Sequence, residues 1–208
     1  PEGLSLAVSC EREDPLDAIV SNTYASFDEL PQGAKVGTSS LRRKTQILKQ
    51  RPDLEIIDLR GNVGTRLSKL DAGQYDAIIL ASAGLKRLGL AERIRHTLTP
   101  EISLPAVGQG ALGLECRTHD QAVLHLIQPL LHAETDACVR AERAFNAYLE
   151  GGCQVPIAGY ATLQNDAISI EGRVGSVDGT VLLRAQHTGK IAEAVQLGVD
   201  LAINLLDQ

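Results

Sequence analysis

The chain of 208 residues has no methionine and no tryptophan, and aromatic residues make up only 3% of it. Its hydrophobic cores must therefore be built from Leu, Ile, Val and Ala, which the 44% hydrophobic content supplies. No apolar run approaches the roughly 18 residues that read as a membrane-spanning helix, so no membrane association is expected. The start, Pro1-Glu2-Gly3, shows no signal-peptide pattern, and the lack of methionine indicates that the chain is part of a longer translation product.

The cysteines also lack a pattern. Cys10, Cys116, Cys138 and Cys153 form no C-x-x-C pair, and no histidine cluster accompanies them. A zinc site, or another metal site, is therefore not expected. A reduced cytoplasmic protein is the preferred interpretation, although an even number of cysteines is also compatible with disulfides. For any one of these residues, a small buried hydrophobe is the ordinary role.

The net charge of −6 argues against nucleic acid as a partner, and its distribution is uneven. From Lys35 to Arg95 there are thirteen basic and six acidic residues, so this part carries +7 while the remainder carries −13. A basic centre in an acidic protein favours a local anion-binding site. The simpler alternative is a solvated helix face on which Lys and Arg are incidental.

Strands and helices alternate between residues 16 and 95. The pattern predicts strands at 35–37, 54–59 and 75–81, and helices at 41–50, 63–72 and 85–88. Such alternation is typical of an α/β fold with right-handed crossovers. Outside this region we expect strands at 4–10, 156–163, 167–175 and 180–186, and helices at 121–131, 135–150 and 190–206. Residues 106–117 are expected to contain a glycine-rich turn followed by a strand. The prediction is a parallel or mixed sheet followed by a small α+β unit with a three-stranded antiparallel sheet.

Two local signals refine the C-terminal part. Asn165-Asp166 and Asp178-Gly179 are typical hairpin turns between the predicted strands. Gly151-Gly152 is expected to end the preceding helix as a glycine C-cap.

Arginine occurs in all three predicted strand-to-helix turns, in the segments 37–43, 60–66 and 83–87. Ligands of α/β sheets bind beyond the carboxyl ends of the strands, where these turns lie. With Ser40 as the N-cap, Arg42 and Arg43 occupy the first helical turn, where each cation costs about 0.3–1 kcal/mol against the helix dipole. An anion between the arginines would compensate, and guanidinium groups bind carboxylates bidentately. We therefore predict a polycarboxylate or phosphate site, in which Ser39 and Ser40 can cap the helix and share the anion.

Two further segments could carry chemistry. Gly108 to Gly113 matches the dinucleotide fingerprint G-x-G-x-x-G, but a strand is predicted after it instead of a helix, which favours a tight hinge crossing. Cys153 follows two glycines on a predicted loop and is a candidate for covalent attachment, the alternative being a buried structural thiol. No histidine stands near it in the sequence, so Cys–His hydrolase chemistry is not expected.

Five of these segments together resemble one known family. They are GTSSLRR, LRGNVGTRL, YDAIILASAGLKRLG, SLPAVGQGALGLECR and LEGGCQVPIAGYA, and their order and spacing are similar to those of porphobilinogen deaminase (hydroxymethylbilane synthase) over essentially the whole chain. The resemblance implies a three-domain enzyme in which two domains are periplasmic-binding-protein-like. Residues 16–104 would be the second domain and 130–208 the third, cofactor-carrying domain. Residues 1–15 would be a remnant of the first domain with the hinge, and 105–129 the hinge and return segment.

The resemblance also implies a chemistry. The family is a transferase of tetrapyrrole biosynthesis, leading to haem, chlorophyll and cobalamin, and joins four porphobilinogen units head to tail into hydroxymethylbilane. Ammonia loss from each unit gives an azafulvene, which the free α-position of the terminal pyrrole attacks. The cofactor is dipyrromethane, joined by a thioether to the cysteine that matches Cys153. The implied cofactor-binding residues are Thr38, Ser39, Ser40, Arg42, Arg43, Arg66 and Gln109, and the implied substrate-binding residues are Arg60, Gly61, Asn62 and Arg87.

One departure from the family pattern limits these expectations. The family's catalytic aspartate lies in an N-terminal segment that precedes the position where this chain begins, and Asp14 and Asp17 do not stand in the matching motif. We therefore expect this chain to be inactive by itself. We also expect the segments 4–10 and 106–117 either to self-associate through bare strand edges or to be poorly ordered, although the full-length protein would be a monomer. The alternative function is a non-enzymatic module for small anions, in which Cys153 has no role.

Overall fold

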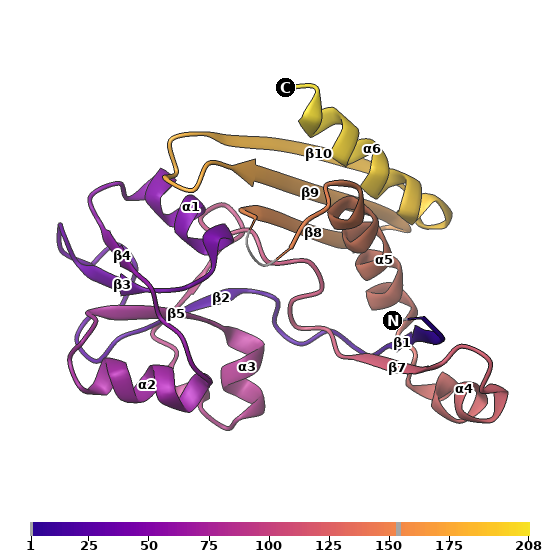
Figure 1. Ribbon diagram of the computed structural model, residues 1–208, viewed down its shortest axis with the longest axis horizontal. Coiled ribbons are helices and arrows are strands. Elements are labelled where there is room, and N and C mark those ends of the chain that lie inside the picture. Colours follow the sequence, from indigo (N-terminus) through magenta and orange to yellow (C-terminus); the bar gives the residue numbers. More distant parts are fainter. Residues whose placement is uncertain (1, 153–154) are drawn as a thin grey trace.

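The computed structural model describes residues 2–152 and 155–208, and its strands form three sheets (Figure 1). A five-stranded mixed sheet lies at one end, a three-stranded antiparallel sheet at another, and a two-stranded sheet beside the latter. This arrangement confirms the predicted fold class, an α/β sheet unit followed by an α+β unit.

The mixed sheet has the strand order β4-β3-β5-β2-β6. Its strands are β2 (Asp17–Val20), β3 (Lys35–Gly37), β4 (Glu55–Ile57), β5 (Ala77–Ala81) and β6 (His96–Leu98). β3 runs parallel to β4 and β5, whereas β2 is antiparallel to both β5 and β6. β2 and β6 were not predicted, because neither short segment shows the alternation that identifies a half-buried strand.

Helices cover both faces of the mixed sheet (Figure 1). α1 (Leu41–Gln50) packs on one face, while α2 (Val63–Asp71) and α3 (Ser82–Arg87) pack on the other. The strand residues alternate accordingly: Ile19 and Ile79 pack with Ile47 of α1, and their neighbours pack with Leu67 and Leu85. Because both faces are buried, β5 reads in the sequence as a continuous apolar run.

The C-terminal unit is an antiparallel sheet of order β10-β9-β8 with two helices on one face. Its elements are α5 (Ala133–Tyr148), β8 (Ile157–Gln164), β9 (Ala167–Gly175), β10 (Leu182–Lys190) and α6 (Ala194–Leu206). Phe145 is fully buried at its centre, and a side chain at Gly159 or Gly172 would collide with its ring. Asn165 and Asp166 have φ angles of 48° and 63°, as the predicted two-residue hairpin turn requires.

The end of α5 differs from the prediction. The left-handed residue that follows the helix is Glu150, with φ 51°, and not a glycine. The amide of Gly151 instead donates to the carbonyl oxygen of Asn146 at 2.8 Å, and a side chain at this position would collide with Asn146. Gly151 is therefore required by close packing, whereas the positive φ falls on the residue before it.

The third sheet contains β1 (Leu4–Ser9) and β7 (Gly113–Arg117), which pair antiparallel and are followed by α4 (Gln121–Ile127). The remaining helical turns are short 3-10 segments at Ala91–Arg93, Gln128–Leu130 and Ile191–Glu193. Leu4 and Leu6 are about 40% exposed on one face of β1. Among the described residues, no helix has both the length and the apolarity needed to cross a membrane.

We expect the protein to self-associate through this two-stranded sheet. In the described chain neither strand has a second neighbour, and unpaired strand edges beside exposed leucines favour pairing with another copy. Sedimentation equilibrium over a concentration series should show association that the double variant Leu4→Lys/Leu6→Lys loses. Leu88→Lys, at an exposed leucine elsewhere, is the control, and a wild-type protein that remains monomeric throughout would contradict this expectation.

Candidate anion-binding site

The candidate site is built on the strand-to-helix turns at the carboxyl ends of β3 and β4. Ser40 is the N-cap of α1 and accepts from the amide of Arg43, while Thr38 Oγ1 accepts from the amide of Ser40 at 3.2 Å. Asn62 caps α2 by accepting from the amide of Thr65 at 2.8 Å. Ser40 therefore has the predicted capping role, and Asn62 is a capping residue as well.

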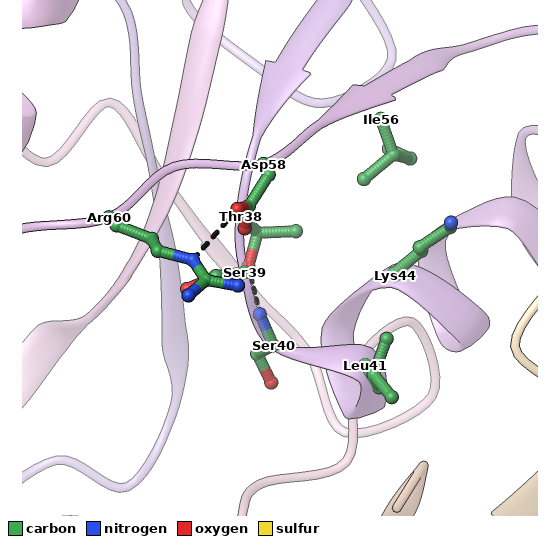
Figure 2. A pocket seen from close by; sticks show the side chains of 8 residues that line it. All are labelled: Thr38, Ser39, Ser40, Leu41, Lys44, Ile56, Asp58 and Arg60. Atoms are coloured by element: carbon green, nitrogen blue, oxygen red, sulfur yellow. Dashed lines mark hydrogen bonds and ion pairs between the residues drawn. The ribbon is translucent and has the colours of Figure 1, made fainter. Parts of the chain in front are cut away.

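A first hollow, here called the strand-end cavity, opens at these turns (Figure 2). It has a volume of about 550 Å³ and is lined by Thr38, Ser39, Ser40, Leu41, Lys44, Ile56, Asp58 and Arg60. Arg60 is 82% exposed, and its Nε lies 2.8 Å from Oδ2 of Asp58. An ion pair this exposed is weak, so Arg60 can exchange Asp58 for another anion at small cost.

A second hollow, the bridging cavity, has a volume of about 520 Å³ and shares Ser39 and Ser40 with the first. Its lining is drawn from the mixed-sheet unit, the glycine-rich crossing and the C-terminal unit. The lining residues are Ser39, Ser40, Arg42, Arg66, Ala106, Val107, Asn146, Gly151, Gly152, Val155 and Ile157. Donors predominate among its polar groups, and no carboxylate occurs among the described residues that line it.

Arg66 is the guanidinium most available in the bridging cavity. Its Nε donates to the carbonyl oxygen of Gly61 at 2.8 Å, and within the described chain its two terminal nitrogens have no protein acceptor. Partial burial, together with the nearby charge of Arg43, lowers the pKa of Arg66. An anion would relieve this unbalanced positive charge, which makes the cavity suited to anionic groups.

Arg42 and Arg43 meet a buried carboxylate of the chain itself. Arg42 makes a bidentate contact with Asp17, with Nη1 2.8 Å from Oδ2 and Nη2 3.2 Å from Oδ1. Arg43 donates from Nε and Nη2 to Oδ1 of Asp17 at 2.9 and 2.8 Å. Asp17, a residue of the chain itself, thus supplies part of the negative charge that compensates the two arginines in the first turn of α1. This role of Asp17 is not predicted from the sequence, since nothing local marks a carboxylate as the partner of arginines 25 and 26 positions away.

Two more side chains complete the shell of Asp17. Ser103 Oγ donates to Oδ2 at 2.7 Å, and Gln109 Nε2 donates to Oδ1 at 3.0 Å. Burial by itself would raise the pKa of Asp17, but the charges and hydrogen bonds of the two arginines outweigh it and hold the pKa below its usual range. Gln109, predicted to touch the cofactor, therefore binds Asp17 and Arg42 in this structure.

A second buried ion pair joins the segment between β1 and β2 to the C-terminal unit. Glu142 of α5 is fully buried and binds Arg12 bidentately, with contacts of 2.6 and 3.0 Å. It also accepts from the amides of Gly108 and Ala161, and burial raises its pKa against the opposing effect of Arg12. The amide of Gly108, which a nucleotide-binding turn would offer to phosphate, is thus used internally, and β7 follows as predicted.

The remaining predicted site residues either do not line these two cavities or are not among the residues that the structure describes. Arg87 is exposed and donates to the carbonyl oxygen of Gly110 at 2.7 Å. Five predicted site residues are absent from the described lining of both cavities: Arg43, Gly61, Asn62, Arg87 and Gln109. Cys153 lies outside the described residues; Gly152 and Val155, its described neighbours on the two sides, line the bridging cavity.

Comparison with known families settles the relationship of the chain. Residues 1–125 match the family model described as porphobilinogen deaminase, dipyromethane cofactor binding domain. Residues 137–207 match that of the porphobilinogen deaminase C-terminal domain. The chain belongs to the porphobilinogen deaminase family. The predicted resemblance is confirmed, and the second match coincides with the α5–α6 unit around the three-stranded sheet.

Solved structures similar to this porphobilinogen deaminase family chain include three proteins of low sequence identity. A pheromone cOB1 precursor/lipoprotein from Enterococcus faecalis is 14% identical, with 62% of this chain and 63% of that chain covered and a TM-score of 0.45. An ABC transporter periplasmic substrate-binding protein from Coxiella burnetii is 15% identical, with 62% of each chain covered and a TM-score of 0.42. A nutrient-binding protein from Burkholderia cenocepacia, bound to methionine, is 14% identical, with 59% and 60% covered and a TM-score of 0.40. The chain spans less than two thirds of the length of each.

Asp17→Asn should lower the free energy of unfolding by about 3–5 kcal/mol, because it leaves two buried guanidinium groups without their counter-charge. Since the folded pKa of Asp17 is depressed, its contribution is complete above the unfolded value of about 3.9 and declines as the pH falls below it. Denaturant unfolding between pH 7 and pH 2.5 measures both effects.

The matched control is Asp58→Asn, which removes an exposed carboxylate from Arg60 and should change the free energy by about 0.5 kcal/mol or less. Equal destabilisation by the two variants would show that Asp17 is not needed as the counter-ion of Arg42 and Arg43.

Proposed function

We propose that this chain is part of a porphobilinogen deaminase, the transferase that joins four porphobilinogen units head to tail into hydroxymethylbilane for tetrapyrrole biosynthesis. The proposal rests on family membership and on the bridging cavity, where Arg42, Arg66 and two serine hydroxyls come together. Each porphobilinogen carries an acetate and a propionate, so the growing product needs a donor-rich, electropositive site. Each condensation forms one carbon–carbon bond and breaks two bonds, the carbon–nitrogen bond of the incoming unit and the α-carbon–hydrogen bond of the terminal pyrrole. The amino group takes up the proton and leaves as ammonia.

The described residues fit a dipyrromethane cofactor in the bridging cavity. The group carries four carboxylates on two apolar rings, and the cavity combines guanidinium and hydroxyl donors with Val107, Val155 and Ile157. When bound, the dipyrromethane supplies the pyrrole carbon from which the chain grows. We propose Cys153 as the thioether attachment point, supported by the position of Gly151, Gly152 and Val155 in the cavity lining.

The individual side chains then take different roles. Arg66 offers both terminal nitrogens to carboxylates in the bridging cavity, those of the cofactor and of the porphobilinogen unit that joins it, and Ser39 and Ser40 add hydroxyls at the N-terminus of α1. Arg60 and Thr38, in the adjoining strand-end cavity, bind a further carboxylate of the incoming substrate. All three guanidinium nitrogens of Arg43 donate hydrogen bonds within the protein, two to Asp17 and one to the carbonyl oxygen of Ile79. Its proposed role is therefore to contribute positive charge to the site without contacting the ligand.

We propose further that the chain does not catalyse the reaction by itself. Proton transfer at the reacting pyrroles needs an ionisable group, and the described lining of the bridging cavity contains no carboxylate. In the adjoining strand-end cavity, Asp58 pairs with Arg60. Asp17 is held by two arginines, and Asp14 accepts from the amide of Leu16 and pairs with Lys86.

Cys10, Cys116 and Cys138 are unpaired thiols, which supports a location in the reducing cytoplasm.

Cys153→Ser should remove the covalent cofactor. The intact mass of the denatured wild-type protein should exceed that of the polypeptide by two pyrrole units, and the variant should have the bare mass, because the serine hydroxyl is a far poorer nucleophile. Cys138→Ser, at a buried thiol whose pKa burial raises to about 11, is the control and should keep the excess. An excess that persists in Cys153→Ser would refute the assignment of the attachment point.

Arg66→Met should weaken porphobilinogen binding about tenfold or more, as expected for the loss of charge-assisted hydrogen bonds worth about 1.5–3 kcal/mol. Isothermal titration calorimetry measures the dissociation constant. Arg117→Met, which removes an exposed arginine distant from both cavities, should leave it unchanged. A non-enzymatic anion module would bind inorganic phosphate as well as porphobilinogen, and would tolerate Cys153→Ser without loss.

A further inference from the structure

Helix α1 is held by the C-terminal unit as well as by its own sheet. It lies between the mixed sheet and the three-stranded sheet (Figure 1). Thr45 Oγ1 donates to the carbonyl oxygen of Ser176 at 2.7 Å, and Lys49 Nζ donates to that of Thr180 at 3.2 Å. A side chain at Gly179, where φ is 75°, would lie 2.7 Å from Cβ of Leu48. The β9–β10 hairpin is therefore seated directly on α1.

Gln46 is the buried centre of this contact, with only 1% of its surface exposed. Its Oε1 accepts from the amide of Leu104 at 2.9 Å and from Nη1 of Arg173 at 2.8 Å. Its Nε2 donates to the carbonyl oxygens of Arg42 and Leu104 at 3.3 and 3.2 Å. Because Leu104 N–H and the guanidinium can only donate, the orientation of the amide group is determined.

Arg173 reaches this amide from β9 and is itself only 3% exposed. Its Nε donates to Oε1 of Glu171 at 2.8 Å, and its Nη1 also donates to the carbonyl oxygen of Glu101 at 3.1 Å. Arg184 pairs with the same Glu171 but is 55% exposed. Arg173 thus connects α1 with residues 101–104, whereas Arg184 pairs with the same carboxylate and makes no hydrogen bond to α1 in the described part of the chain.

The connection continues into the candidate site. The carbonyl oxygen of Leu104, which accepts from Gln46, also accepts from Nη1 of Arg42 at 2.7 Å. Arg42 lines the bridging cavity and binds Asp17. A chain of direct contacts therefore runs from Arg173 through Gln46 and Leu104 to a guanidinium of the anion site.

We propose that Arg173 is a positioning residue for the anion site: through Gln46 it fixes helix α1 against residues 101–104 and so holds Arg42 at the bridging cavity. The proposal rests on the proposed function, which makes that cavity a binding site for the carboxylates of the cofactor and of the porphobilinogen unit that joins it. An apolar residue could close the same interface without the cost of burying a guanidinium. The directional hydrogen bonds to Gln46 and Glu101, which an apolar residue cannot make, therefore distinguish Arg173.

The test compares Arg173→Met with Arg184→Met. Arg173→Met should weaken porphobilinogen binding about five- to tenfold in calorimetry and should speed amide hydrogen exchange at Leu104, whose N–H is bonded to Gln46. Arg184→Met removes the other partner of Glu171 and should leave both readouts unchanged. Arg173→Lys, which can still donate to Gln46, should recover part of the affinity.

Gln46→Met provides a second route should Arg173→Met fold poorly, since it leaves the Glu171 ion pairs intact. It should weaken binding to a similar extent, and the double variant should be no weaker than either single variant, because the two residues act in one chain of contacts. Fully additive losses would overturn the proposal, as would unchanged affinity in folded Arg173→Met or equal losses in Arg184→Met.

Titration of the same variants with inorganic pyrophosphate separates this proposal from the proposed function. A wild-type protein that binds pyrophosphate but not porphobilinogen would count against the deaminase assignment, while the comparison of Arg173→Met with Arg184→Met would still decide the role of Arg173. A wild-type protein that binds neither probe would overturn both proposals.

Discussion

The buried carboxylate of Asp17 is the constraint on which the rest of the site depends. It accepts hydrogen bonds from Arg42, Arg43, Ser103 and Gln109, which come from α1, the segment after β6 and the glycine-rich crossing. Two guanidinium groups this deeply buried are tolerable only because a carboxylate and several acceptors surround them. The same interaction brings together three segments that are remote in sequence, so the fold and the electrostatics of the site have a common origin.

The internal anion also sets how much positive charge is left for a ligand. Arg42 and Arg43 share one carboxylate and so retain a single excess charge, to which Arg66 adds a second. Arg42 and Arg43 are held in place by several hydrogen bonds to Asp17, whereas Arg66 keeps terminal nitrogens free of protein acceptors in the described chain. Rigid donors held at fixed positions cost less entropy when a ligand binds than flexible surface lysines do. The division between a fixed pair and a free arginine therefore suits a site that holds carboxylates in defined positions.

Much of the fold could be predicted because the informative signals are local. The strand-to-helix alternation, the cap at Ser40 and the turn at Asn165-Asp166 all depend on neighbouring residues, and the structure contains each of them. The segments that bring arginines to the strand ends were located for the same reason. The pairing of Asp17 with Arg42 and Arg43 could not be predicted, because Asp17 lies on β2, a short strand that shows no alternation in the sequence. The antiparallel pairing of β2 with β5 depends on tertiary structure. The left-handed Glu150 was missed because Gly151, the expected cap, is required there by packing against Asn146.

The lining of the bridging cavity shows why the parts of this chain act together. Its hydroxyls and guanidinium groups come from the mixed-sheet unit, Val107 from the crossing, and Asn146 and Ile157 from the C-terminal unit. A cofactor attached at the proposed position, Cys153, reaches the arginines only if the C-terminal unit is held in a fixed relation to α1. Two separate polar contacts provide this relation: Arg12 with Glu142 on one side, and Arg173 with Gln46 on the other. Since both are buried and directional, they specify one relative placement where apolar packing alone would allow several.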